Sequence, residues 1–320
     1  MDRSVLITGA AGNLGGFLAR HLLGSDLELR LMYHHRPIAE DITQGKDVRC
    51  FPADLARPET LREACRGVDC IVHFAGVLFR PRPERFLPRT NTEYVRNLVG
   101  VAVQSGVKRF ILVSFPQVEG PTTPEHPATG RRPAENDVPI SAHARTRLQA
   151  EHCVFCAAEA STLEPVILRA GTIYGRGVLM VEAARWLMQR RLLAVWPQPT
   201  WYHFLSIMDF LAAAEAAVRK QALHGVYNVG DDQPATIQDF LDRAADHWRL
   251  PRPWRVPKAL VHVGAACVEF GALVLRTPAP FTRDFVRLGM VPHVMDTARM
   301  RRELLPSLTY PTINEGMSAM

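Results

Sequence analysis

Lysine and tyrosine are missing from the middle of this 320-residue chain. The sequence has no lysine between Lys108 and Lys220 and no tyrosine between Tyr94 and Tyr174. A lysine placed beside a tyrosine lowers the pKa of the phenol and makes it a useful proton donor. The gap therefore excludes a catalytic tyrosine–lysine pair from this stretch, and any proton transfer there must use other side chains.

Cysteines are few and scattered. Among the six, only Cys153 and Cys156 form a C-x-x-C, which lies inside a helix predicted over 145–160 and has no second pair. This pattern disfavours a zinc site, so we expect no metal and reduced thiols. No signal peptide precedes the first predicted strand, which starts at Ser4, so we expect a cytoplasmic protein.

Clusters of basic residues are also lacking. The net charge is +6, but the arginines are spread along the chain, and Arg131-Arg132 is typical of the short pairs that occur. A nucleic-acid-binding protein usually concentrates its basic residues on one face or helix. We therefore expect no nucleic-acid partner, and the phosphates of a cofactor are the acidic group that we expect the chain to bind.

No apolar run is long enough for an ordinary membrane span. The most apolar stretch, residues 259–275, is short for a bilayer and contains His262 and Glu269. We interpret it as a buried or substrate-facing helix. Contact with a membrane or a partner is the disfavoured alternative.

A glycine-rich turn follows the first predicted strand. Residues 4–8 form a short apolar run, and apolar residues at helical spacing follow over 15–23. In such a turn Gly9 permits a tight bend, Gly12 lets the backbone approach a pyrophosphate, and Gly15 lets helix and strand pack closely. The start of the helix adds unpaired N–H groups that favour phosphate. The predicted dinucleotide contacts in this turn are Thr8, Gly9, Gly12, Asn13, Leu14 and Gly15.

Strand patterns alternate with helical patterns up to about residue 170, which predicts a doubly wound parallel α/β sheet. We predict a Rossmann domain over residues 1–175 and a smaller C-terminal substrate-binding lobe over 176–320. Residues of about 203–230 are expected to return to the Rossmann sheet. The assembly state stays open, with a homodimer as one alternative.

These segments resemble the extended short-chain dehydrogenase/reductase family, which is NAD-dependent epimerase/dehydratase-like and carries the turn T-G-x-x-G-x-x-G. The resemblance covers almost the whole chain and is closest to the 3β-hydroxysteroid dehydrogenase and dihydroflavonol reductase branches. It implies that Asp54 and Leu55 lie at the adenine and that Asn91 sits in the helix where the family keeps an asparagine. It also implies that the loop after the fourth strand, with Phe74, Ala75 and Gly76, lies at the cofactor.

The resemblance also bears on the choice of cofactor. Members that use NAD carry an acidic residue after the second strand, where it binds the ribose hydroxyls. Here that strand, at about 28–32, is followed by Tyr33-His34-His35-Arg36. Arg36 could face a 2′-phosphate, so NADP(H) is favoured and NAD(H) remains an alternative. Arg36 could equally stack on the adenine or point to water.

The family's proton-transfer residues are replaced. The resemblance implies a Ser or Thr, a Tyr and a Lys, but this chain has Phe115, His143 and Arg147 at those positions. His143 can transfer protons near neutral pH. Arg147 can bind ribose hydroxyls but stays charged. In the alternative interpretation both merely fill space, with Arg147 paired to Glu151 one turn further on.

We predict an NAD(P)H-dependent oxidoreductase that acts on a fairly apolar small molecule and relies on the nicotinamide for hydride chemistry. Its candidate catalytic residues are His143, Arg147, Ser114 and Tyr174. The alternatives are a non-catalytic dinucleotide-binding sensor or assembly protein, a non-redox biosynthetic enzyme, and a sugar epimerase. Fold alone does not separate them.

Overall fold

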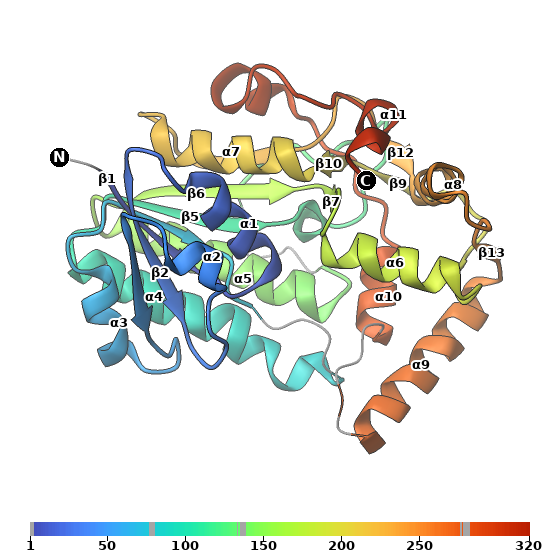
Figure 1. Ribbon diagram of the computed structural model, residues 1–320, viewed down its shortest axis with the longest axis horizontal. Coiled ribbons are helices and arrows are strands. Elements are labelled where there is room, and N and C mark those ends of the chain that lie inside the picture. Colours follow the sequence, from blue (N-terminus) through green and yellow to red (C-terminus); the bar gives the residue numbers. More distant parts are fainter. Residues whose placement is uncertain (1–2, 77–80, 133, 135–138, 276, 278–281) are drawn as a thin grey trace.

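The computed structural model describes residues 3–76, 81–132, 134, 139–275, 277 and 282–320. Its centre is a seven-stranded parallel sheet in the order β11-β6-β5-β4-β1-β2-β3 (Figure 1). The strands are β1 (Arg3–Thr8), β2 (Leu27–Tyr33), β3 (Val48–Pro52), β4 (Cys70–His73), β5 (Arg109–Ser114), β6 (Glu164–Ala170) and β11 (Gly225–Val229). This confirms the predicted doubly wound parallel sheet.

The central strands are apolar on both faces because helices cover both. In β1, Val5 and Ile7 point to one face and pack with α1 (Asn13–Leu22) and α7 (Ile207–Arg219). Leu6 points to the other face, as alternation along a strand requires. There it packs with α3 (Pro58–Cys65), α4 (Tyr94–Gln104) and α5 (Ala142–Glu159). Two hydrophobic cores thus sandwich one sheet.

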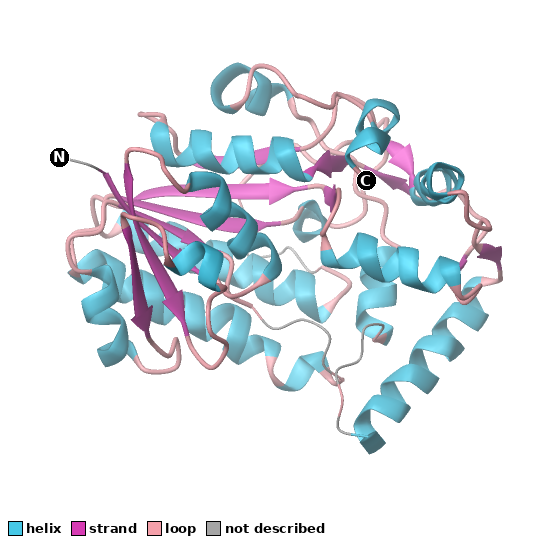
Figure 2. Ribbon diagram, viewed as in Figure 1, coloured by secondary structure: helices cyan, strands magenta, loops and turns pink. Residues whose placement is uncertain are grey.

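The C-terminal half builds a second layer beyond the carboxyl ends of the strands. Its helices are α6 (Leu179–Gln189), α8 (Ile237–Trp248), α9 (Lys258–Leu275), α10 (Arg283–Gly289) and α11 (Ile313–Gly316). Its short strands, which Figure 2 contrasts with the long central ones, are β7 (Thr172–Tyr174), β8 (Ala194–Val195), β9 (Trp201–Tyr202), β10 (Phe204–Ser206), β12 (Ala235–Thr236) and β13 (Trp254–Arg255). A short helix, α2 (Glu40–Thr43), precedes β3.

Helix α9 differs from the sequence interpretation. It lies at the outer edge of the lobe (Figure 1), and only Ala265, Glu269 and Ala272 are buried. Phe270 and Val274 are 69% and 65% exposed. Of the two predicted alternatives, a buried or a substrate-facing helix, the buried one is therefore wrong. By length and composition alone, with a mean hydropathy of 1.6, α9 would also suit a membrane span.

Candidate active site

The glycine turn between β1 and α1 has the geometry of a phosphate cradle. Gly9 has a φ of 74°, which L-residues with side chains rarely adopt, and its carbonyl accepts a hydrogen bond from Gly12 N at 2.8 Å. A Cβ atom at Gly15 would overlap the same carbonyl. Gly12 caps α1 without a side-chain hydrogen bond, so the first N–H groups of the helix stay open to an anion. The residues present therefore fit a dinucleotide pyrophosphate.

The loop after β4 crosses this turn where the strand order reverses, which is where ligands bind in doubly wound folds. A Cβ at Gly9 would lie 2.9 Å from Ala75 N, so the two segments are in close contact. Below them, Thr8 Oγ1 and His73 Nδ1 are 2.8 Å apart. Burial lowers the pKa of His73 to about 3, so the ring is neutral and acts as a fixed support for the turn.

Asn13 ties the turn to the C-terminal lobe. Its Nδ2 donates to Gly177 O at 2.9 Å, and its Oδ1 accepts from Leu179 N at 2.9 Å. Leu14, the next residue, packs partly buried against the core that contains α1 and α7. Asn13 is thus occupied in holding the start of α6 beside the start of α1.

Asp54 and Leu55 are the residues expected at the adenine. Asp54 follows β3 and closes its own turn, since Oδ1 accepts from Ala56 N at 2.9 Å. Its other carboxylate oxygen lies 3.8 Å from His34 Nε2. Leu55 is buried, and its carbonyl accepts from Asn97 Nδ2 at 2.9 Å. Arg36 is exposed just beyond β2. The structure brings His34 and Asp54 together at this edge and leaves Arg36 at the surface.

Arg147 points from α5 at the loop after β4. A Cβ atom at Gly76 would lie 3.6 Å from Arg147 Nη2 and 3.6 Å from Asn91 Oδ1. Arg147 Nε and Nη1 are buried and have no hydrogen-bond partner among the described residues. Burial lowers the pKa of the guanidinium to about 10, which still leaves it charged at neutral pH. Buried polar groups are normally satisfied, so this guanidinium suits a ligand oxygen beside the loop after β4.

The alternative pairing of Arg147 with Glu151 is not observed. Glu151 Oε2 instead lies 2.6 Å from Arg169 Nη2, and its Oε1 accepts from Ser114 Oγ at 2.5 Å. Arg169 also pairs with Glu119, which follows β5. The Ser114 hydroxyl is therefore committed to a buried charge network, so the structure does not offer it to a substrate in this arrangement.

His143 has a partner that sequence reasoning missed. Its Nδ1 lies 2.6 Å from Asp284 Oδ2, at the start of α10. Asp284 Oδ1 also accepts from Ala142 N at 2.9 Å. Although its own burial opposes the shift, these bonds lower the pKa of Asp284 below its ordinary value, so the carboxylate stays ionised. Because a carboxylate only accepts, Nδ1 carries the proton and Nε2 is the nitrogen left for chemistry.

Only a weak signal for Asp284 exists in the sequence. Thr282 caps α10 by accepting from Phe285 N, so Asp284 reads as an ordinary acidic residue in the first turn of a helix. Nothing local links it to α5.

Tyr174 is not brought to His143. It is fully buried against Phe204 and Phe240, and its hydroxyl donates to Thr312 O at 3.5 Å. Burial raises the pKa of the phenol far above its ordinary value. These contacts give Tyr174 a place in the core of the lobe. The site therefore gathers His143, Asp284 and Arg147 but not the two candidate hydroxyls.

Comparison with known proteins agrees with the fold. Residues 5–230 match the model of the NAD dependent epimerase/dehydratase family. The chain is 26% identical to 2-alkyl-3-oxoalkanoate reductase of Stenotrophomonas maltophilia (strain K279a), over 98% of this chain and 97% of the relative. It is 26% identical to ceramide reductase of Caulobacter vibrioides (strain NA1000 / CB15N), over 87% and 81% of the two chains. The solved structure of MoeE5 in complex with UDP-glucuronic acid and NAD has the same fold, with a TM-score of 0.75, 19% identity and coverage of 99% and 97%.

Proposed function

Because the chain belongs to the NAD-dependent epimerase/dehydratase family, we propose that it reduces an apolar carbonyl compound, with NADP(H) as the preferred cofactor and His143 as the proton donor. The observation that carries the proposal is the His143–Asp284 pair. It lies one helical turn from the unpaired guanidinium of Arg147 on the same face of α5.

When bound, the nicotinamide would supply or accept the hydride. His143 would act from its imidazolium form, in which both ring nitrogens carry protons. Nε2 donates its proton to the substrate oxygen as negative charge grows there, and the neutral ring then takes a proton from solvent. Asp284 holds Nδ1–H at 2.6 Å, which fixes the ring and stabilises its positive charge.

Arg147 would take the cofactor-binding part of the lysine that the family uses. Its orphaned Nε and Nη1 atoms suit the ribose hydroxyls, and the permanent charge prevents it from relaying a proton. The roles are then assigned to residues differently from those of a tyrosine–lysine pair. His143 carries the proton, Asp284 orients the ring, and Arg147 holds the cofactor.

The cofactor preference rests on the end of β2. Arg36 is exposed there and is followed by Pro37 rather than by a carboxylate. A guanidinium at this place suits a 2′-phosphate, whereas NAD would favour an acidic residue. The MoeE5 complex contains NAD, so NAD(H) stays the comparison cofactor in any test.

The substrate class follows from the relatives that cover most of the chain. Their names describe reduction of a 2-alkyl-3-oxoalkanoate and of a ceramide, and both kinds of molecule carry apolar chains. Phe115, in place of a catalytic hydroxyl, adds apolar surface next to β5. A 3-oxo compound with a long alkyl chain is therefore the first substrate to try.

The test is oxidation of NADPH, followed by absorbance, with 3-oxo fatty acyl compounds of increasing chain length. We expect turnover that rises with chain length and falls when His143 is replaced. Saturable cofactor binding without turnover of any carbonyl compound would favour the sensor alternative. Absence of binding to either cofactor would overturn the proposal.

A further inference from the structure

Helix α9 has its polarity reversed relative to the surface helix of a globular protein. Such a helix normally turns an apolar stripe inward and polar residues outward. In α9 the buried side chains are two alanines and Glu269, whose carboxylate accepts from Arg283 Nε at 2.9 Å. Val261 is partly buried and packs against the core. The outward face carries large apolar side chains, each more than a third exposed: Leu260, Val263, Val268, Phe270, Leu273, Val274 and Leu275. A contiguous apolar face of this kind marks an interaction surface.

The start of this apolar face is basic. Four exposed basic residues lie near it: Arg191, Arg252, Arg255 and Lys258. We call these four residues the basic rim. Asp246 and Asp242 pair with Arg252 and Arg255, and the rim stays net positive after these two carboxylates are counted. The surface is therefore complementary to an apolar layer bordered by negative charge.

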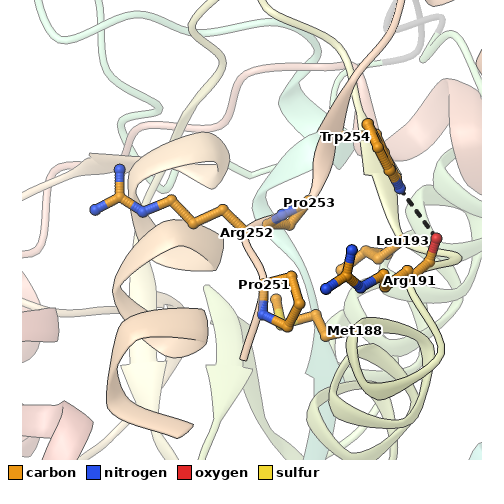
Figure 3. A pocket seen from close by; sticks show the side chains of 7 residues that line it. All are labelled: Met188, Arg191, Leu193, Pro251, Arg252, Pro253 and Trp254. Carbon is orange, nitrogen blue, oxygen red and sulfur yellow. Dashed lines mark hydrogen bonds between the residues drawn. The ribbon is translucent and has the colours of Figure 1, made fainter. Parts of the chain in front are cut away.

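An exposed tryptophan stands at the start of the helix. Trp254, on β13, is 61% exposed, and its indole N–H donates to Arg191 O at 3.0 Å. Figure 3 shows this bond beside a hollow that Met188, Leu193 and Pro253 help to line. Tryptophan held with one edge polar and one edge apolar is enriched where proteins meet the headgroup region of a bilayer.

We propose that α9 docks this protein on the surface of a bilayer that contains anionic phospholipid. The helix would lie in the plane of the membrane, with its outward face at the acyl boundary and the basic rim at the phosphates. It would not span, because spanning would pull Glu269 out of its ion pair with Arg283.

A second copy of the chain is a poorer occupant. Leu260, Val263, Cys267, Phe270 and Val274 follow the a/d spacing of a helix pair. However, the basic rim lies at the start of α9, so a parallel pair would bring like charges together. An antiparallel pair would leave both rims without a counter-charge, whereas an anionic surface supplies one.

The docking surface adjoins the candidate active site. Glu269 on α9 binds Arg283, and the next residue, Asp284, holds His143. Docking would thus bring the Asp284 side of the candidate active site close to the acyl chains of the bilayer. The proposal does not depend on which reaction the site performs, since its test measures binding alone.

The test is flotation of the full-length protein with vesicles of phosphatidylcholine alone or mixed with phosphatidylglycerol. We expect capture by the anionic vesicles, little by phosphatidylcholine alone, and release by salt because the rim charges are exposed. Phe270→Asp should lower partitioning by roughly tenfold or more, since it replaces a membrane-facing ring with a charge. Met208→Asp is the matched control, because Met208 is 48% exposed on α7, and it should bind like the parent.

A second measurement needs no charge-introducing variant. Anionic vesicles with brominated acyl chains should quench tryptophan fluorescence of the parent, and Trp254→Phe should lose part of that quenching. The proposal fails if the parent does not float with anionic vesicles. It also fails if Met208→Asp impairs flotation as much as Phe270→Asp does. A soluble parent dimer that Phe270→Asp converts to monomer would instead assign the face to a second copy.

Discussion

His143 Nδ1 and Asp284 Oδ2 lie 2.6 Å apart, although 141 residues separate them in the chain. His143 belongs to α5, which packs on the Rossmann sheet, and Asp284 belongs to α10 of the C-terminal lobe. The proposed proton donor is therefore oriented only when the lobe is packed against α5. This dependence distinguishes the site from a tyrosine–lysine pair, whose members share one helix.

Replacing Asp284 tests the orienting role. Asp284→Asn can present an N–H to Nδ1 and so favours the wrong tautomer, and we expect kcat to fall by roughly 10²-fold or more. Affinity for NADPH, measured by calorimetry, should stay near that of the parent. His143→Ala should give a similar loss of kcat. A double variant no worse than either single variant would show that the two residues act as one unit. Full activity in Asp284→Asn would remove the pair from the mechanism.

Arg147 should respond in opposite directions in the free and cofactor-bound protein. Arg147→Met removes a buried guanidinium whose Nε and Nη1 have no hydrogen-bond partner among the described residues. We expect the ligand-free variant to be more stable to denaturant, by about 1–3 kcal/mol, because a buried unsatisfied group is costly. Cofactor affinity should fall by roughly tenfold or more, since hydrogen bonds to a charged group are worth about 1.5–3 kcal/mol. If both stability and affinity fall, Arg147 is a packing residue.

The glycine turn can be tested by steric block. Gly12→Val places a branched side chain where the backbone would meet the pyrophosphate, and a Cβ there already lies 3.0 Å from Gly9 O. Calorimetry should show loss of binding to NADPH and NADH in a protein that remains folded. Gly100→Val is the control, since a Cβ at Gly100 meets nothing within 4 Å. Parent-like affinity in Gly12→Val would place the cofactor elsewhere.

A buried carboxylate should make stability depend on pH. Asp231 is fully buried, and both carboxylate oxygens lack a hydrogen-bond partner among the described residues. Burial, together with nearby Asp209, raises its pKa to about 8, whereas an unfolded aspartate titrates at about 3.9. The folded state thus holds a proton that the unfolded state has lost, so this residue lowers stability progressively as the pH rises from about 4 to about 8.

Asp231→Asn removes that titration. We expect the variant to melt at a higher temperature than the parent at pH 8, and the difference to shrink as the pH falls toward 5. The buried histidines have the opposite effect on stability, because burial lowers the pKa values of His73 and His293 to about 3. Both proteins contain these histidines, so comparing the two at each pH cancels the histidine contribution. An equal difference at every pH would mean that Asp231 does not titrate in this range.

The sheet and the glycine turn could be predicted because their signals are local. An apolar run such as 4–8, a turn glycine such as Gly9 and a helix that follows are adjacent in sequence, and the same residues form β1, the turn and α1. The replacement of tyrosine and lysine by His143 and Arg147 was also visible, since it lies on one helix face.

The parts that could not be predicted depend on tertiary contacts. The apolar composition of residues 259–275 predicts a buried or substrate-facing helix, but burial depends on what packs against a helix, and α9 has large side chains facing outward. Asp284 carries no local mark that would link it to α5. The sequence alone does not identify the ion-pair partner of Glu151. In the folded protein Glu151 pairs with Arg169 on β6 and not with Arg147 on its own helix.

Asn13 gives the glycine turn a mechanical role beyond holding phosphates. Its side chain bonds both Gly177 O and Leu179 N, so α6 cannot move away from the turn without breaking two hydrogen bonds. Coupling between two sites is reciprocal. A dinucleotide that makes the turn more rigid must therefore also make the start of α6 more rigid. Any molecule that displaces α6 must weaken dinucleotide binding by the same coupling free energy.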